Sequence, residues 1–209
     1  MGLALRAAVL LSGAGSTFQN LLDLSRAGAL PIDVRIVVAT KAGAYGLERA
    51  RAAGIANELV ARKAYADGGT FGAAIDRALA PHDVEVVLMA GLIHLWRIPP
   101  QYEHRVINVH PSLIPAFCGP GYYDLRVHQA VVDSGVRVTG CTVHYADDHY
   151  DHGPIILQRT VEVGDTDTAE DVRAKVQALE REAFPEAIRL HAAGRLRVVG
   201  RRVRVVAGG

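Results

Sequence analysis

The sequence predicts an α/β fold in which a mainly parallel β-sheet is extended by an antiparallel hairpin in the C-terminal half. Short apolar runs alternate with segments of helical periodicity through the first half, which indicates βαβ units. These runs are almost continuously apolar, as in strands that helices cover on both faces. In the second half, residues 138–146 alternate in character, a polar loop follows, and residues 154–163 return as a strand, so an antiparallel pair is expected.

Composition limits the class of protein. The 209 residues are 22% charged and 50% hydrophobic with a net charge of +1, which is typical of a globular enzyme and gives no reason to expect nucleic acid or a membrane surface as a partner. The two cysteines, Cys118 and Cys141, form no Cys-x-x-Cys pair, so a reducing, cytoplasmic location is expected. The apolar N-terminus around Arg6 is interpreted as a first strand rather than a signal peptide.

The first half supplies the expected parallel strands and their helices. Strands are expected at 7–11, 34–39, 57–60 and 84–90, and helices from Phe18 onward, at 44–53 and at 70–79.

A glycine-rich turn, Ser12 to Thr17, lies between the first strand and its helix. Free backbone N–H groups and the helix dipole at such a turn favour an anion. The pattern is not the dinucleotide-binding G-x-G-x-x-G, because Phe18 stands at the third glycine position. The alternative is a tight turn in which Ser16 or Thr17 caps the helix.

Parallel sheets bind ligands at the carboxyl ends of their strands. This rule places the Ser12–Thr17 turn, the loop after Ala90 and the end of the strand that holds Asn108 along one edge. The loop contains Ile93, His94, Leu95 and Trp96. Side chains of this kind either pack beneath their loop or line a pocket.

The stretch from Val106 to Pro115 is the most informative in the chain. Asn108 and His110 are two residues apart at the end of an apolar strand and therefore point to the same face. An amide beside an imidazole suits a carbonyl that becomes an oxyanion, because the amide donates to the oxygen and the imidazolium passes a proton. The alternative is a core histidine satisfied by a neighbour beside a turn-forming asparagine.

The remaining second half provides further candidate elements. The loop 116–127 carries Tyr122 and Tyr123 and could close as a lid, whereas Cys118 has no evident base and is interpreted as incidental. A helix is expected at 128–133. An acidic segment, 165–171, precedes a long helix that ends near Ala193 and presents Gln177 and Glu180 on one face.

Two further clusters have ordinary explanations. The loop after residue 146 gathers histidines and aspartates, but their spacing is not that of a zinc site, so no metal is expected. The segment Leu196 to Val206, broken at Gly200, is expected to be a hairpin. Its arginines at 201, 202 and 204 would protect a sheet edge.

Three segments resemble the signature of the folate-dependent formyltransferases: Asn-x-His-Pro-Ser-Leu-Ile-Pro from Asn108, Gly-Cys-Thr-Val-His from Gly140, and Asp-His-Gly-Pro-Ile-Ile from Asp151. The most similar branch acts on phosphoribosylglycinamide, and the similarity extends from about Arg6 to Arg195. The resemblance implies a Rossmann-like mononucleotide-binding sheet in one formyltransferase domain, with a phosphate-binding half at 1–104 and a catalytic and folate-binding half at 105–209.

The resemblance also implies a role for each candidate residue. The catalytic set would be Asn108, His110 and Asp151, with Asp151 favouring the charged form of His110. The remaining roles are as follows: Gly15, Ser16 and Thr17 bind the substrate phosphate, Gln177 and Glu180 bind the ribose and glycinamide, and Ile93, His94, Leu95, Trp96 and Asn108 bind the folate.

The chain departs from the family pattern at several positions. Histidine replaces the usual arginine at position 94, and nothing basic stands near Gly68, where the family has a residue that meets the folate tail. His152 stands where a small residue is usual, and the loop 116–127 is longer. Ala14 and Thr17 often are asparagines in the family. These departures concern the recognition of the folate glutamate and the setting of Asp151.

The implied reaction transfers the formyl group of 10-formyltetrahydrofolate to the amine of N1-(5-phosphoribosyl)glycinamide in purine biosynthesis. It gives formylglycinamide ribonucleotide and tetrahydrofolate, with small-molecule substrates, no metal, and a monomer or homodimer. The alternatives are another folate-dependent formyltransferase, a formyltetrahydrofolate hydrolase, and a non-catalytic phosphate or folate binder. The transfer-RNA relative needs a further C-terminal domain, for which 209 residues are expected to leave no room, and the bacterial hydrolase carries an extra N-terminal regulatory module, whereas here the motif begins within the first 20 residues. Sugar formyltransferases generally lack the phosphate turn and the Gln177/Glu180 pair.

Overall fold

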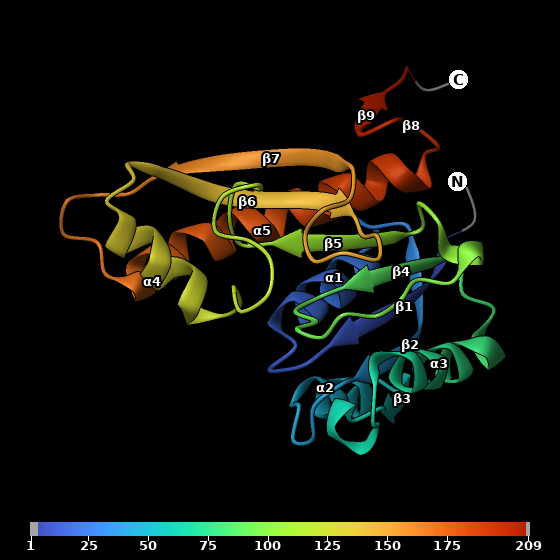
Figure 1. Cartoon of the computed structure of the whole chain (residues 1–209). Coiled ribbons are helices and arrows are strands. Elements are labelled where there is room, and N and C mark those ends of the chain that lie inside the picture. Colours follow the sequence, from blue (N-terminus) through green and yellow to red (C-terminus); the bar gives the residue numbers. More distant parts are fainter. Residues whose placement is uncertain (1–3, 208–209) are drawn as a thin grey trace. The chain divides into compact units, whose positions relative to one another are not determined.

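The computed structural model describes residues 4–207. The chain forms two compact units, and the division falls between Ile107 and Asn108, within strand β5 (Figure 1). The expected N-terminal strand is present, but Met1 to Leu3 lie outside the described residues.

The first unit contains the predicted parallel sheet. Its strands occur in the order β3-β2-β1-β4, and every pair is parallel. The strands are β1 (Leu5–Leu11), β2 (Ile32–Ala39), β3 (Ala56–Leu59) and β4 (Val86–Met89). From Ala7 to Leu11, strand β1 is completely buried, which explains its unbroken apolar sequence.

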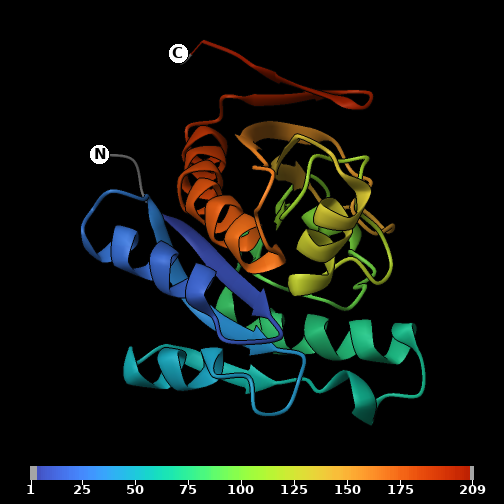
Figure 2. The same ribbon diagram turned by 90° about the vertical axis from the view of Figure 1, so that its left-hand side faces the viewer.

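Helices connect these strands by right-handed crossovers. The strand order therefore places α1 (Ser16–Arg26) and α2 (Gly46–Ala52) on one face of the sheet and α3 (Gly68–Leu79) on the other (Figure 2). Short 3₁₀ helices follow in the loops: η1 (Arg62–Ala64), η2 (Ala80–His82) and η3 (Pro100–Tyr102).

The second unit is built on the predicted antiparallel pair. Its strand order is β5-β6-β7-β9-β8, with β5 (Val106–His110), β6 (Val138–Tyr145), β7 (Ile155–Glu162), β8 (Leu196–Val199) and β9 (Arg202–Val205). Strands β6 and β7 are antiparallel, as are β8 and β9, and β9 pairs with β7 at Ile155 and Arg202. The expected C-terminal hairpin therefore continues the sheet of this unit.

Two helices pack within the second unit. The long helix α5 (Ala169–Ala192) lies against β6, β7 and α4 (Leu125–Ser134), as Figures 1 and 2 show. Its start is fixed by a capping box: the Asp171 N–H donates to Thr168 Oγ1 at 3.2 Å, and the Thr168 N–H donates to the Asp171 carboxylate at 2.9 Å.

Helix boundaries differ modestly from those expected. Helix α3 begins at Gly68 instead of Thr70, because the Asp67 carboxylate accepts from the Thr70 N–H at 2.8 Å and serves as the N-cap. Helix α4 begins at Leu125 instead of His128. Within residues 4–207, no helix combines the length and apolar character needed to cross a membrane.

Candidate active site

Asn108 and His110 lie at the carboxyl end of β5, where Pro111 ends the strand. The extended backbone places the two side chains on one face, as the sequence predicts. His110 is only 4% exposed, and Asn108 is half-buried. Both polar groups are thus largely removed from water and depend on protein partners.

The partner of Asn108 is His144, from β6. The Asn108 Nδ2 lies 3.0 Å from His144 Nε2, and His144 Nδ1 lies 2.9 Å from the Tyr145 carbonyl oxygen. Since a carbonyl only accepts, His144 carries its proton on Nδ1 and accepts from the amide at Nε2. Burial lowers the pKa of His144, which agrees with this neutral form. Asn108 is therefore held with one amide N–H still available to a ligand.

His110 is placed between two acceptors. Its Nε2 lies 3.0 Å from the Phe117 carbonyl oxygen, and its Nδ1 faces Asp151 Oδ1 at 3.4 Å. Both ring nitrogens of His110 therefore face an oxygen atom.

Asp151 approaches His110 from the loop between β6 and β7. Its second oxygen, Oδ2, accepts from the Gly119 N–H at 2.8 Å, and its side chain is 11% exposed. The structure thus brings together the three residues expected to form the catalytic set. His144 was not predicted to belong to the site. Its Nδ1 faces the Tyr145 carbonyl, which leaves Nε2 to accept from Asn108 and so to orient the amide.

The turn after His110 is fixed by side chains from β6 and β7. Thr142 Oγ1 donates to the Ser112 carbonyl at 2.7 Å and accepts from the Ile114 N–H at 3.0 Å. Gln158 Nε2 in turn donates to Thr142 Oγ1 at 2.9 Å. The Ile114–Pro115 peptide bond is cis. Burial, followed by the charge of Asp151, raises the pKa of the nearby Cys118 thiol, which suits its interpretation as incidental rather than nucleophilic.

Gln177 and Glu180 lie on α5, also in the second unit, and both are half-buried. Burial raises the pKa of Glu180 to about 8, and Arg181 partly opposes this shift. The Glu180 charge is near Cys141 of β6 and contributes to raising the pKa of that thiol to about 12, after the larger effect of burial. Within residues 4–207 the Gln177 and Glu180 side chains make no hydrogen bond, so both are free to meet a ligand.

The predicted anion-binding turn lies in the first unit. Gly15 is the N-cap of α1 with φ of 70°, and no side chain caps the helix, so the alternative of a Ser16 or Thr17 cap is wrong. A Cβ on Gly15 would lie 2.7 Å from the Cα of Gly46, so only glycine fits this approach of α1 to α2. The uncapped N–H groups of the first turn remain available to an anion.

Arg49 is a second, unpredicted feature of this turn. Its Nε donates to the Ala14 carbonyl at 2.9 Å, and its Nη1 donates to Gln19 Oε1 at 3.1 Å. The guanidinium thus adds positive charge beside the turn. Local sequence patterns could not locate it there, because the contact joins residues 35 positions apart.

The loop expected to bind folate is fixed to the same unit by hydroxyl groups. Ser12 Oγ accepts from the Ile93 N–H at 3.1 Å and lies 2.7 Å from Thr40 Oγ1, which in turn lies 2.9 Å from His94 Nδ1. Burial, followed by the charges of Arg62 and Lys41, lowers the pKa of His94. A neutral His94 does not replace the cationic arginine that is usual at this position.

The Trp96 side chain packs inside the first unit. It is 1% exposed, and its Nε1 donates to Asp76 Oδ1 on α3 at 3.0 Å. Leu95, by contrast, is 38% exposed. Any folate contact of Trp96 would therefore use its backbone. The phosphate turn and this loop belong to the first unit, and Asn108, His110, Asp151, Gln177 and Glu180 to the second, so their common edge stays a prediction.

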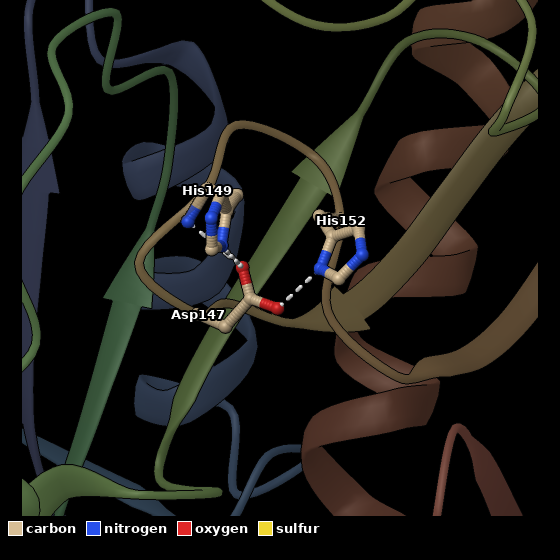
Figure 3. A group of neighbouring side chains, drawn as sticks. All are labelled: Asp147, His149 and His152. Atoms are coloured by element: carbon tan, nitrogen blue, oxygen red, sulfur yellow. Dashed lines mark hydrogen bonds and ion pairs between the residues drawn. The ribbon is translucent and has the colours of Figure 1, made fainter.

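A group of potential metal ligands lies in the loop that contains Asp151. Asp147, His149 and His152 bring their ligand atoms within 4.8 Å of one another, as Figure 3 shows. The His152 ring already has two partners, because Nδ1 lies 2.7 Å from Asp147 Oδ2 and Nε2 lies 2.7 Å from Arg201 Nη1. A guanidinium at this distance opposes a cation, so the group is better described as a hydrogen-bonded network.

The comparisons with known proteins show the family of the chain. Residues 5–188 match the formyl transferase family, and the chain belongs to that family.

The names of individual relatives define a narrower class of enzyme than the family does. The chain is 34% identical to phosphoribosylglycinamide formyltransferase of Escherichia coli K12 over 192 residues, which cover 91% of this chain and 88% of that protein. The crystal structure of glycinamide ribonucleotide transformylase 1 from Symbiobacterium toebii superimposes with a TM-score of 0.91 at 42% identity, covering 99% of this chain and 96% of the other. The trifunctional purine biosynthetic protein adenosine-3 of Gallus gallus is 36% identical over 195 residues, or 92% of this chain, which spans only 19% of that longer protein.

Proposed function

We propose that the protein is a phosphoribosylglycinamide formyltransferase. It transfers the formyl group of 10-formyltetrahydrofolate to the amine of N1-(5-phosphoribosyl)glycinamide, in the purine (IMP) pathway. The observation that carries the proposal is the convergence of Asn108, His110 and Asp151 in one half-buried site. A binder of phosphate or folate would not need this set of donors and acceptors, because binding alone requires no oxyanion stabilisation.

The reaction begins when the substrate amine attacks the formyl carbon. The formyl oxygen becomes an oxyanion, and it accepts from the free amide N–H of Asn108. His110 supplies the second donor through Nε2, where the formyl oxygen replaces the Phe117 carbonyl that now lies 3.0 Å away. One such donor is worth about 3 kcal/mol of transition-state stabilisation.

Collapse of the tetrahedral intermediate breaks the bond between the formyl carbon and the folate N10. The attacking amine must lose one proton, and the departing N10 must gain one. Asp151 is the group placed to accept and return this proton through water, because its Oδ1 lies beside the reacting centre, 3.4 Å from His110 Nδ1. Proton count and charge balance without any further reactant.

The remaining polar groups would bind the two substrates. The N–H groups of Gly15, Ser16 and Thr17 would hold the phosphate, with Arg49 adding charge. Gln177 and Glu180 would hold the ribose and glycinamide. Backbone groups of residues 93–96 would meet the pterin, as would Asn108. Binding the phosphate remote from the reacting carbon places the amine in position for attack.

The biochemical setting follows the same proposal. The substrates are small molecules, the co-substrate is a folate, and no metal takes part. We place the protein in the cytoplasm as a monomer or homodimer. The neutral state of His94 and the lack of a basic residue at Gly68 suggest weak discrimination for the folate glutamate tail.

A single experiment tests the activity. Purified protein is mixed with 10-formyltetrahydrofolate, with and without phosphoribosylglycinamide, and release of tetrahydrofolate is followed by absorbance. Release only in the presence of the amine supports the transferase. Release without the amine would indicate a hydrolase, and no release in either mixture would leave a binder or a different acceptor.

A further inference from the structure

The turn between β8 and β9 contacts the loop that carries Asp151. Arg201, in this turn, donates from Nη2 to the His152 carbonyl at 2.9 Å, and its Nη1 lies 2.7 Å from His152 Nε2. One guanidinium therefore contacts both the backbone and the ring of His152, the residue that follows Asp151. Edge protection, the role expected for the hairpin arginines, does not require either contact.

The His152 ring also contacts Asp147, at the other end of the loop. His152 Nδ1 lies 2.7 Å from Asp147 Oδ2, and Arg201 Nη1 lies 3.4 Å from the same ring nitrogen. Asp147 Oδ1 in turn accepts from the His149 N–H at 2.9 Å. Figure 3 shows how Asp147 joins the two histidines. Burial would raise the pKa of Asp147, but these hydrogen bonds and the two histidine charges outweigh it and lower the pKa.

The backbone conformation at Asp151 explains why contacts that hold this loop affect the position of the Asp151 carboxylate. Asp151 has φ of 50°, a left-handed conformation that is strained for a non-glycine residue. On the far side, Gly153 is fixed against β6, since a Cβ there would lie 1.8 Å from the Tyr145 carbonyl oxygen. His152 lies between these two points and is exposed. Besides Arg201, the Gly119 N–H and His110 contact the Asp151 carboxylate directly, and the contact between His152 and Asp147 spans the loop.

We propose that Arg201 is a positioning residue, which through His152 holds the Asp151 carboxylate against His110. The proposal rests on the proposed function, because it assigns Arg201 a part in the same proton transfer. As a consequence, the C-terminal hairpin helps to position an active-site residue in addition to extending the sheet. His152, at a position where a small residue is usual, is the side chain that makes this contact possible.

The test compares two neighbouring arginines. Arg201→Ala removes both contacts with His152, and Arg202→Ala is the matched control, because Arg202 is exposed and its side chain makes no hydrogen bond or ion pair within residues 4–207. We expect Arg201→Ala to lower kcat about tenfold, with KM for both substrates and the thermal midpoint close to those of wild type, because a misplaced reacting group costs rate rather than binding. Arg202→Ala should match wild type in all four quantities.

Two further variants separate positioning from a merely structural role. His152→Gln keeps an acceptor for Arg201 and should retain most of kcat, whereas His152→Ala should lose about as much as Arg201→Ala. The double variant Arg201→Ala with His152→Ala should then be no slower than either single variant, since residues that act as one unit are not additive. The proposal would be overturned if the losses in kcat of the two single variants multiply in the double variant. It would also be overturned if Arg201→Ala and Arg202→Ala have equal kcat.

Amide hydrogen exchange of residues 146–154 provides a readout that does not depend on activity. We expect faster exchange in Arg201→Ala than in Arg202→Ala, because the loop opens locally. If wild-type protein transfers no formyl group, the proposed function fails, but the exchange comparison still decides whether Arg201 holds the loop. Equal exchange in the two variants would overturn the positioning role even in an active enzyme.

Discussion

Replacing His144 would test whether this buried histidine orients Asn108. His144→Leu puts an apolar side chain of similar size in β6 and removes the acceptor that lies 3.0 Å from Asn108 Nδ2. A hydrogen bond of this kind is worth a net of about 1–1.5 kcal/mol, so the productive amide orientation is favoured roughly tenfold. We therefore expect kcat to fall about tenfold on substitution, with KM for both substrates little changed.

Asn108→Ala removes the donor itself and sets the scale for this measurement. Loss of one oxyanion donor lowers kcat by about 100-fold to 1,000-fold. If His144 acts only through Asn108, the double variant should be no slower than Asn108→Ala alone. Thr139→Val is a matched control in β6: Thr139 is 2% exposed, and its hydroxyl has no partner within the described residues, so this change should leave kcat intact and slightly raise the thermal midpoint.

The assay is steady-state release of tetrahydrofolate, with circular dichroism and thermal melting to show that each variant folds. The reasoning is refuted if His144→Leu has wild-type kcat while Asn108→Ala is impaired. It is refuted equally if the losses of the two single variants multiply in the double variant, because His144 would then act independently of the amide.

Three other changes have defined outcomes. Asp151→Asn and His110→Ala should each lower kcat by at least about 100-fold while substrate dissociation constants from calorimetry change little; near-wild-type turnover in either would remove that residue from the mechanism. Gly15→Ala should destabilise the protein by about 1 kcal/mol or more in urea unfolding and raise KM for the phosphorylated substrate, because φ is 70° and Gly46 is in the way; unchanged stability and KM would contradict both roles. Glu180, whose pKa is raised from 4.5 to about 8, binds its proton more tightly when folded, so its contribution to stability is present below pH 4.5 and is lost as the pH rises toward 8. Glu180→Gln should therefore gain stability relative to wild type between about pH 5 and 8 in urea unfolding, and parallel pH profiles would show that burial does not shift this carboxyl.

Much of the candidate site could be predicted because its signals are local. Asn108 and His110 share a face through the two-residue period of a strand, and proline ends that strand. Gly15 is required where a strand turns sharply into a helix, and the acidic cap of α5 is a short-range pattern. The parallel and antiparallel parts of the sheet likewise follow from apolar runs and alternation. Each of these depends on neighbours within a few positions.

Contacts between distant segments could not be predicted from such local patterns. The bond from Asn108 to His144 joins residues 36 positions apart, and that from Arg201 to His152 joins residues 49 apart. Neither pairing changes a local periodicity, so the sequence presented His144 as one of several histidines and Arg201 as one charge on a hairpin edge. Trp96 is similar: its loop could have held it over a pocket, and only packing against α3 decided that it is buried.

The sequence alone therefore determined which residues could perform the chemistry and on which elements they lie, because residue type and local period suffice for that. Only the tertiary structure decided the protonation and orientation of those residues. The tautomer of His144, the two acceptors around His110 and the raised pKa of Glu180 all depend on burial and on partners that folding brings from elsewhere in the chain.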